Sequence, residues 1–300
     1  MKIASITIAY NEEYRFEGWC KWYEEYKDEI DYHIIVDNGS EPDYLEKVKS
    51  HFKESIIIER ETNGGCTGAY NSGIRYALQL PDVGAIMLLG GDIRLKPGTI
   101  EVLKKFLFSK NEYGMVGAVV FRKDSNIIES YGDTVNKIGI PHINYRNRHV
   151  EDVPQSLEVS YVGGGVNLAK REFYETVGLQ DENLFMYNDE MDMFYRAKKL
   201  GIKEAVTKDA VAWHQHISYP STNDLSWKMS YLNGRNRVYI IKKHLGLKGL
   251  LMFFYMFSVE TLVTIRDIKY KKSRRNYWWK IKGFWAGLKG NMDNSFAGWE

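Results

Sequence analysis

The sequence has very little cysteine, no excess of one charge and no long uninterrupted apolar run. Its two cysteines, Cys20 and Cys66, lie far apart, which excludes a disulfide framework and a cysteine zinc site and favours a reducing compartment. The 41 basic and 39 acidic side chains nearly cancel, so no overall field favours nucleic acid as a partner. The apolar run at the start of the sequence is too short and too rich in β-branched residues for a signal peptide. We find no internal repeat and no low-complexity linker.

The 300 residues, 44% of them hydrophobic, are enough to bury one large core or two smaller ones. In the first half, short apolar runs bounded by turn residues alternate with helix-like stretches. We predict strands at 3–9, 33–36, 55–58 and 85–89, and helices at 16–26, 44–52 and 67–80. This alternation predicts an α/β fold with a parallel sheet, helices on both faces, and ligands beyond the carboxyl ends of the strands.

Polar or glycine-rich segments follow three of these predicted strands. Asp37, which opens Asp37-Asn38-Gly39-Ser40, is either part of an ordinary β-turn or an acceptor for the ring N–H of a pyrimidine. Asn63-Gly64-Gly65 either gives a helix start room against a strand or lets a pyrophosphate or ribose approach the backbone. Asp92, after Gly90-Gly91, is either a cap or turn residue or a ligand of Mg²⁺ or Mn²⁺.

The order of these segments resembles the family 2 glycosyltransferases, which have the GT-A fold. The resemblance rests on residues 7–11, 37–40, 63–73 and 88–92 and extends from residue 1 to about residue 245. It implies a Rossmann-like, mostly parallel sheet flanked by helices, with a nucleotide-binding half at 1–100 and an acceptor half at 101–245. The residues that we assign to donor binding are Ala9, Tyr10, Asn11, Asp37, Asn38, Asn63, Gly64, Gly65, Asn71, Gly91, Asp92, Gly164 and Arg235.

The metal motif of the family, Asp-x-Asp or Asn-x-Asp, is present here only in part. Gly90 stands at its first position and Asp92 at its last. The resemblance implies that Asp92 and His214 hold one Mn²⁺ or Mg²⁺ ion at the donor diphosphate, where imidazole is a reasonable ligand of Mn²⁺. A lone histidine is more often structural. In the polar run 231–237, the guanidinium of Arg235 is a candidate phosphate contact.

Residues 185–196 resemble the stretch that the family writes as Glu-Asp-x-Asp-x-x-x-Arg. Acidic residues at a helix start are also expected from the helix dipole alone. An aromatic lead-in, however, places these carboxyls at the edge of an apolar site, where a pKa rises towards the working pH. Glu190 stands where the family has its general base, usually Asp, and Asp189 is the second candidate. We predict that Asp192 pairs with Arg196 on the same helix face.

These assignments imply an inverting, metal-dependent glycosyltransferase. Its donor would be a nucleotide diphosphate sugar, dTDP-rhamnose or a UDP-hexose, and its acceptor a saccharide, free or polyprenyl-linked, in surface polysaccharide biosynthesis. Two alternatives stay open. A nucleotidyltransferase would want a Gly-rich loop with Arg and Lys directly after the first strand, where this chain has residues 10–13. The other alternative is a nucleotide-sugar-binding module that became inactive when the first acidic residue of the metal motif was lost.

Residues 246–300 change character, and we predict an amphipathic helical tail. The apolar stretch 250–265 contains Glu260 and is shorter than the about 20 residues of a spanning helix. Basic residues at 269–275 and aromatic ones at 277–279 suit an anionic membrane surface, but packing on the catalytic domain or on a second subunit, giving a homodimer, is also open. Residues 282–290 resemble tails of rhamnosyltransferase-like members, which favours a rhamnosyl donor. We expect a cytoplasmic protein, peripheral on the inner face of the membrane.

Overall fold

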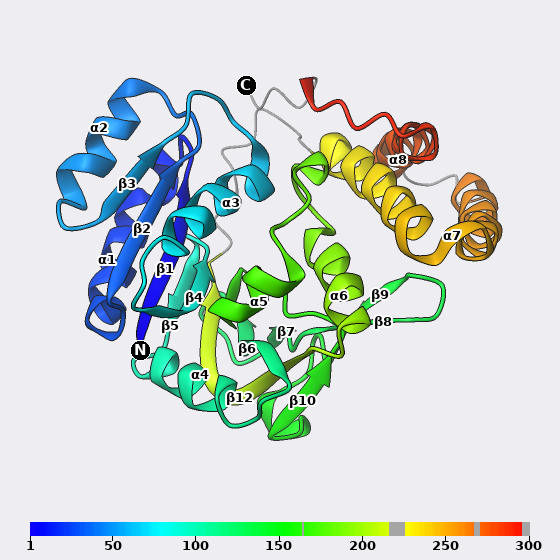
Figure 1. Cartoon of the computed structure of the whole chain (residues 1–300). Helices are drawn as coiled ribbons and strands as arrows, with labels where there is room; N and C mark the ends of the chain where they lie inside the picture. The colour runs from blue at the N-terminus through cyan, green and yellow to red at the C-terminus, as the bar shows by residue number, and fades with distance from the viewer. Residues whose placement is uncertain (164, 216–225, 267–270, 296–300) are drawn as a thin grey trace.

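The computed structural model describes residues 1–163, 165–215, 226–266 and 271–295, and its core is a twisted sheet of ten strands between helical layers (Figure 1). The main strand order is β10-β12-β6-β11-β4-β1-β2-β3. The first half contains β1 (Lys2–Ala9), β2 (Tyr32–Asp37), β3 (Ile56–Glu59), β4 (Val83–Leu89), α1 (Phe16–Tyr26), α2 (Pro42–His51) and α3 (Gly65–Ala77). These four strands are parallel, as the alternation of strand and helix patterns predicts, and the expected α/β fold is confirmed.

The second half adds strands of both directions to the same sheet. Its elements are β5 (Ile93–Leu95), α4 (Thr99–Leu107), β6 (Tyr113–Arg122), β7 (Ile128–Ser130), β8 (Asp133–Val135), β9 (Pro141–Ile143), β10 (Ser156–Val159), β11 (Val166–Lys170), α5 (Arg171–Val177), α6 (Asp189–Lys199) and β12 (Lys203–His214). Strand β11 runs antiparallel between β4 and β6, and β12 runs parallel to β6. The end of β12 pairs with β5, which brings His214 next to the loop after β4.

Helices cover both faces of the sheet because successive strand residues point to opposite sides. On one face, Phe16 and Trp19 of α1 and Tyr44 of α2 pack against Ala9 and Ile35. Helix α4 covers the same face further along the sheet. Helices α3 and α5 cover the other face, where the alternate residues of β1 and β4 are buried. The sheet is therefore enclosed by two apolar layers.

Two long helices, α7 (Ser226–Arg266) and α8 (Lys271–Lys289), lie beside the sheet on the side remote from α1 and α2 (Figure 1). Helix α7 breaks at Gly246, whose φ of 62° is left-handed, at the position where the sequence suggests a boundary. Helix α8 crosses α7 closely, because a side chain on Gly283 or Gly287 would overlap the carbonyl oxygens of Tyr231 and Arg235. None of the helices in the described ranges has the length and apolar character needed to cross a bilayer.

Candidate active site

The carboxyl end of β2 presents an unsatisfied acceptor. Asp37 is buried, and its Oδ2 accepts hydrogen bonds from the backbone N–H groups of Gly39 (3.3 Å) and Ser40 (3.2 Å). Its other oxygen, Oδ1, is buried with no hydrogen-bond partner in the described part of the chain. Such an orphaned acceptor is costly unless something else satisfies it. The N–H of a bound pyrimidine would satisfy it, and the donor role of Asp37 stays a prediction.

The loops around Asp37 are tied together by amide side chains. Asn38 donates to Asn63 Oδ1 (2.8 Å) and accepts the backbone N–H of Gly64 (3.1 Å). Asn11, in a left-handed conformation after Ala9 and Tyr10, accepts the backbone N–H of Glu41 (2.8 Å). The predicted donor residues at the ends of β1, β2 and β3 thus lie at one edge of the sheet, with their loops cross-linked.

The glycines that open α3 accommodate the protein's own backbone. Gly65 has a φ of 70°, and an added Cβ would overlap the carbonyl of Phe185, which accepts the N–H of Thr67 at 3.2 Å. Asn71 is also used internally, since it donates to the carbonyl of Gln180 (2.9 Å) and to Glu182 (2.9 Å). This corrects the expectation of a direct donor contact at Asn71. The close approach draws the 180–187 segment onto the nucleotide-binding half.

Asp92 lies at the centre of a chain of charged groups beyond β4. Its Oδ2 is 2.7 Å from the guanidinium of Arg15 and 3.2 Å from Nε2 of His214. The other ring nitrogen of His214, Nδ1, is 3.0 Å from Glu129 on β7, and Arg15 also contacts Glu12 at 2.6 Å. The side chain of Asp92 stays 24% exposed, so a ligand can reach it.

The protonation of these groups follows from their neighbours. Burial alone would lower the pKa of His214, but its hydrogen bonds to Asp92 and Glu129 raise it to about 9. Burial opposes ionisation of Asp92 too, yet the contacts with His214 and Arg15 bring its pKa below the ordinary value. Burial raises the pKa of Glu12 to about 7 against the opposing charge of Arg15. Without other ligands, the imidazole is therefore a cation between two carboxylates.

Asp92 and His214 are chemically suited to share a divalent cation. Within the residues that the structure describes, no three His, Cys, Asp or Glu side chains form a complete metal-binding group. A cation here would therefore have two protein ligands and would take the others from diphosphate oxygens and water, as is common for Mg²⁺. Glu129 suits this arrangement, because a metal-binding histidine usually donates its second N–H to a carboxylate or carbonyl.

The segment before α6 has an unusual backbone. Phe185, Tyr187 and Asn188 all have positive φ values, a conformation that ordinary side chains rarely adopt and that clusters at functional sites. Asn236 of α7, fully buried, holds this segment by donating to the carbonyl oxygens of Leu184, Met186 and Tyr187 at 2.8–2.9 Å. The start of α6, with Asp189 and Glu190, is thus fixed by α7 on one side and α3 on the other.

Both candidate bases have raised pKa values. Burial raises the pKa of Asp189 to about 6, and burial with the charge of Asp189 raises that of Glu190 well above its ordinary range. Glu190 lines a small internal cavity of about 20 Å³ together with Glu204, whose pKa burial raises to about 8. Burial, aided by the charges of Asp189, Glu190, Glu12 and Asp92, raises the pKa of the Cys66 thiol.

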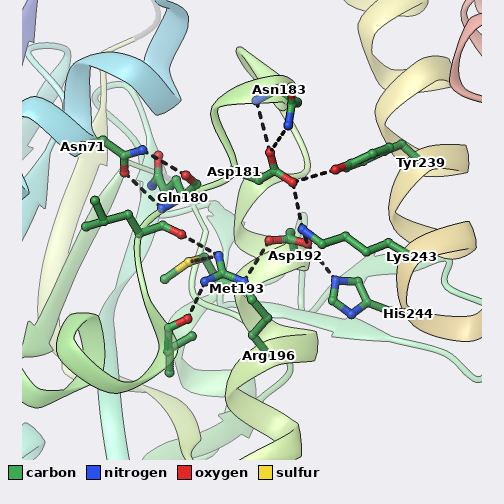
Figure 2. Close-up of polar contacts among 12 residues, drawn as sticks. Asn71, Gln180, Asp181, Asn183, Asp192, Met193, Arg196, Tyr239, Lys243 and His244 are labelled. Carbon is green, nitrogen blue, oxygen red and sulfur yellow. Dashed lines mark hydrogen bonds and ion pairs between the residues drawn. The ribbon is translucent and has the colours of Figure 1, made fainter. Parts of the chain in front are cut away.

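Asp192 joins α6 to α7 (Figure 2). Its fully buried carboxylate contacts Nε of Arg196 (2.9 Å), which confirms the predicted pair. It also contacts Lys243 (2.8 Å) and His244 (2.7 Å) of α7, and Lys243 reaches on to Asp181 (2.8 Å). Asp192 is therefore a structural link.

Arg235 does not face a phosphate site. It is fully buried, and its five N–H groups donate within the protein. The acceptors are side-chain oxygens of Asn236 and Asn294 and carbonyl oxygens of Asn183, Leu184 and Asp293. This corrects the phosphate role expected of Arg235, since the guanidinium instead ties α7 to the 183–184 turn and to the segment after α8.

Gly165, which precedes β11 in the acceptor half, lies next to the loop after β4. Its carbonyl accepts the N–H of Gly90 (2.8 Å), and the same loop contains Gly91. Gly164, an expected donor residue, lies outside the described residues.

A larger hollow of about 530 Å³ lies between the β8–β9 hairpin and β10. It is lined by Thr134, His142, Ile143, Asn144, Tyr145, Arg146, Arg148 and Leu157.

Sequence reasoning missed Arg15, Glu129 and Asn236. Glu129 is 85 positions from His214 and lies in a three-residue strand that matches no motif. Asn236 stands beside Arg235 in the polar run that the sequence does single out, but its partners are backbone carbonyls about 50 positions away. Arg15 had a weak signal, because it follows the polar turn after the first strand.

Residues 6–178 match the sequence profile described as Glycosyl transferase family 2. The low-salt glycan biosynthesis hexosyltransferase Agl10 of Haloferax volcanii is 24% identical over 208 residues, which are 68% of this chain and 65% of that protein. The alignment thus covers slightly less than two thirds of the relative's length.

Two solved structures show the same fold at low sequence identity. GalNAc-T7, solved with UDP, GalNAc and Mn²⁺, superposes with a TM-score of 0.65 at 10% identity, covering 100% of this chain and 58% of that one. The mannosyltransferase PcManGT from Pyrobaculum calidifontis, solved with GDP-Man and Mn²⁺, gives a TM-score of 0.58 at 14% identity, covering 97% and 87%. At these identities the likeness supports the fold alone.

Proposed function

Because the chain belongs to glycosyl transferase family 2, we propose that it moves a sugar from a nucleotide diphosphate donor to a hydroxyl of a saccharide acceptor, with inversion at the anomeric carbon. The observation that carries this proposal is the Asp92–His214 pair beyond β4, supported by the unpaired Oδ1 of Asp37 at the end of β2 and by the buried base candidate Glu190 at the start of α6. Each suits a different part of the reaction.

The donor is proposed to bind along the ends of β1, β2 and β4. Asp37 Oδ1 would accept the ring N–H of the base, which removes the cost of its unpaired state. Asp92 and His214 would hold one Mn²⁺ or Mg²⁺ ion, which when bound would neutralise charge on the leaving diphosphate. Arg15, 2.7 Å from Asp92, is placed to compensate negative charge at the same point.

Glu190 is proposed to take the proton of the attacking hydroxyl. Burial and the neighbouring carboxyl Asp189 raise its pKa, and a base with a raised pKa is the stronger proton acceptor. A single base acting opposite the leaving diphosphate gives one displacement and therefore inversion. Asp189 is the second candidate for this role.

The identity of the two sugars is a finer proposal. The tail motif at 282–290 supports a rhamnosyl donor such as dTDP-rhamnose, and the hexosyltransferase relative supports a hexosyl donor. For the acceptor we propose a saccharide, free or polyprenyl-linked, in surface polysaccharide synthesis on the cytoplasmic side. The 530 Å³ hollow in the acceptor half has the volume typical of ligand sites and carries Arg146 and Arg148.

The test is a donor screen with a base variant. Purified protein is incubated with UDP- and dTDP-sugars and Mn²⁺ or Mg²⁺, and released nucleotide is measured. Glu190→Gln should lower kcat about 10²–10⁴-fold while donor affinity is kept, because only proton transfer is lost. Glu61→Gln, at an exposed position, is the matched control. Near wild-type transfer by Glu190→Gln would refute the base, and binding of nucleotide sugars without any turnover would favour a binding module.

A further inference from the structure

The part of α7 after Gly246 has one covered and one uncovered apolar face. On the covered face, Phe257 stacks on Phe284 of α8 with ring centres 4.5 Å apart, and Phe253 stacks beside it at 6.2 Å. The uncovered face exposes Leu247 (72%), Leu251 (62%), Tyr255 (68%) and Leu262 (69%), together with Met252, Phe254, Met256 and Val259.

These side chains form a continuous stripe. Leu247, Leu251 and Tyr255 are four residues apart, so successive turns of the helix present them on the same side. Helix α8 adds two exposed indoles, Trp278 (57%) and Trp285 (48%), which are seven residues apart and therefore also share a side. Eight large apolar side chains exposed along one helix mark an interaction surface. The structure also answers one open question, because this face is not packed on the described parts of the protein's own catalytic domain.

The segment that carries the stripe has an excess of positive charge. Residues 246–300 contain ten Lys and Arg against four Asp and Glu, whereas residues 1–245 contain 31 against 35. Lys248 of α7 and Lys282 and Lys289 of α8 are exposed. The segment that carries the apolar stripe is thus cationic on a protein whose remainder is slightly anionic.

We propose that this face, Leu247 to Leu262 of α7 with Trp278 and Trp285 of α8, docks on the surface of an anionic lipid bilayer. Aliphatic side chains would enter the interface, indoles would lie at headgroup depth, and lysines would meet lipid phosphates. A second copy of the chain fits less well, because a symmetric dimer would bring two cationic segments together. The proposal does not rest on the sugar-transfer reaction, and of the two acceptors proposed above it favours the polyprenyl-linked one.

The experiment is co-sedimentation of the full chain with large unilamellar vesicles. Vesicles of phosphatidylcholine and phosphatidylglycerol (3:1) should pellet the protein, and pure phosphatidylcholine should pellet much less, because the electrostatic part is lost. The double variant Leu251→Ser/Tyr255→Ser should weaken binding to the anionic vesicles by about tenfold or more, because two exposed apolar side chains no longer insert. Both positions face away from the packed core, so the fold should be kept.

The control is Phe108→Ser/Leu200→Ser, which removes two exposed apolar side chains outside α7 and α8. It should bind vesicles as the wild type does. Failure of the wild type to pellet with anionic vesicles, or undiminished binding by Leu251→Ser/Tyr255→Ser, would overturn the proposal. If the wild type does not bind vesicles but is a dimer in light scattering, and Leu251→Ser/Tyr255→Ser is a monomer, the face binds a second copy of the chain. That result would also overturn the proposal. Donor turnover measured without vesicles reports on sugar transfer separately.

Discussion

His214 contacts two carboxylates, and the two have different consequences for a bound cation. Asp92 would share the cation with it, whereas Glu129, 3.0 Å from Nδ1, can only orient the ring. An imidazole that donates Nδ1–H to Glu129 keeps Nε2 for the metal. Without the carboxylate, the ring would lose both its tautomer preference and its fixed angle.

We therefore predict that Glu129→Gln weakens metal activation more than it weakens donor binding. The Mn²⁺ concentration for half-maximal nucleotide release should rise about 10- to 100-fold, the usual cost of losing such an orienting partner. Titration of activity with Mn²⁺ measures this, with Glu61→Gln as the exposed control. An unchanged Mn²⁺ requirement would mean that Glu129 does not act through His214 in this way.

Asp192 makes the free energy of unfolding vary with pH in the acidic range. Burial opposes its ionisation, but His244, Lys243 and Arg196 lower its pKa from 3.8 to about 2. Because the folded pKa lies below the unfolded one, the stabilisation is complete above about pH 4 and is lost as the pH falls towards 2. At neutral pH it amounts to about 2 kcal/mol.

Replacing this buried carboxylate tests the link. Asp192→Asn should destabilise the fold by about 3–5 kcal/mol at pH 7, because Lys243 and Arg196 lose their buried partner. The difference from the wild type should shrink below pH 4, where the wild-type carboxylate itself becomes protonated. Urea unfolding between pH 2.5 and 7 measures both effects, and Asp124→Asn makes the same change at an exposed site. A difference that stays constant with pH would contradict the assignment.

At the level of elements, the crossing of α7 and α8 depends on glycine. Gly287 lies against the carbonyl of Arg235 and Gly283 against that of Tyr231, with no room for a Cβ. Because Arg235 and Asn236 hold the 183–187 segment, the helix crossing supports the loop that carries the candidate base.

A methyl group at this crossing should therefore be costly. We expect Gly287→Ala to lower stability by about 1–3 kcal/mol, as overpacking does, because the obstructing atoms are backbone and cannot rotate away. Gly68→Ala in α3 is the matched control, since its nearest neighbour is the flexible end of Arg60 at 3.2 Å. Thermal unfolding of both variants gives the comparison, and equal melting temperatures would show that the helices separate without strain.

At the level of the whole molecule, the tail supports the catalytic half as well as presenting a surface. Arg235 donates two of its five hydrogen bonds to oxygens of Asp293 and Asn294, beyond the end of α8. Phe284 of α8 belongs to the same apolar cluster as Leu184 and Met191 beside the base candidate. The suggested division after residue 245 stays a proposal, and these contacts run across it.

We predict that a chain ending after Leu245 unfolds at a lower temperature than the full chain. It would leave the guanidinium of Arg235 with unpaired donors and would expose the apolar side of α6. Circular dichroism melting curves of the two proteins measure this. Coincident curves would show that residues 246–300 form an independent unit.

Much of the nucleotide-binding half was determined by the sequence alone. Apolar runs between turn residues predicted β1 to β4, and a helix was predicted at 16–26, where α1 lies. Asp192 and Arg196 were predicted as a pair because a four-residue spacing places them on one helix face. Such signals are local, since they depend on periodicity and on neighbours within one turn, and they therefore survive in a single sequence.

The tertiary structure decided the roles that depend on distant partners. Only folding brings Glu129 to His214, 85 positions away, and only folding encloses Arg235 so completely that no N–H remains for a phosphate. The sequence by itself determined which chemical groups stand at the strand ends. A polar side chain can form the same kinds of hydrogen bond with a ligand and with the protein's own backbone. Long-range packing therefore decided which of the two each of these groups faces.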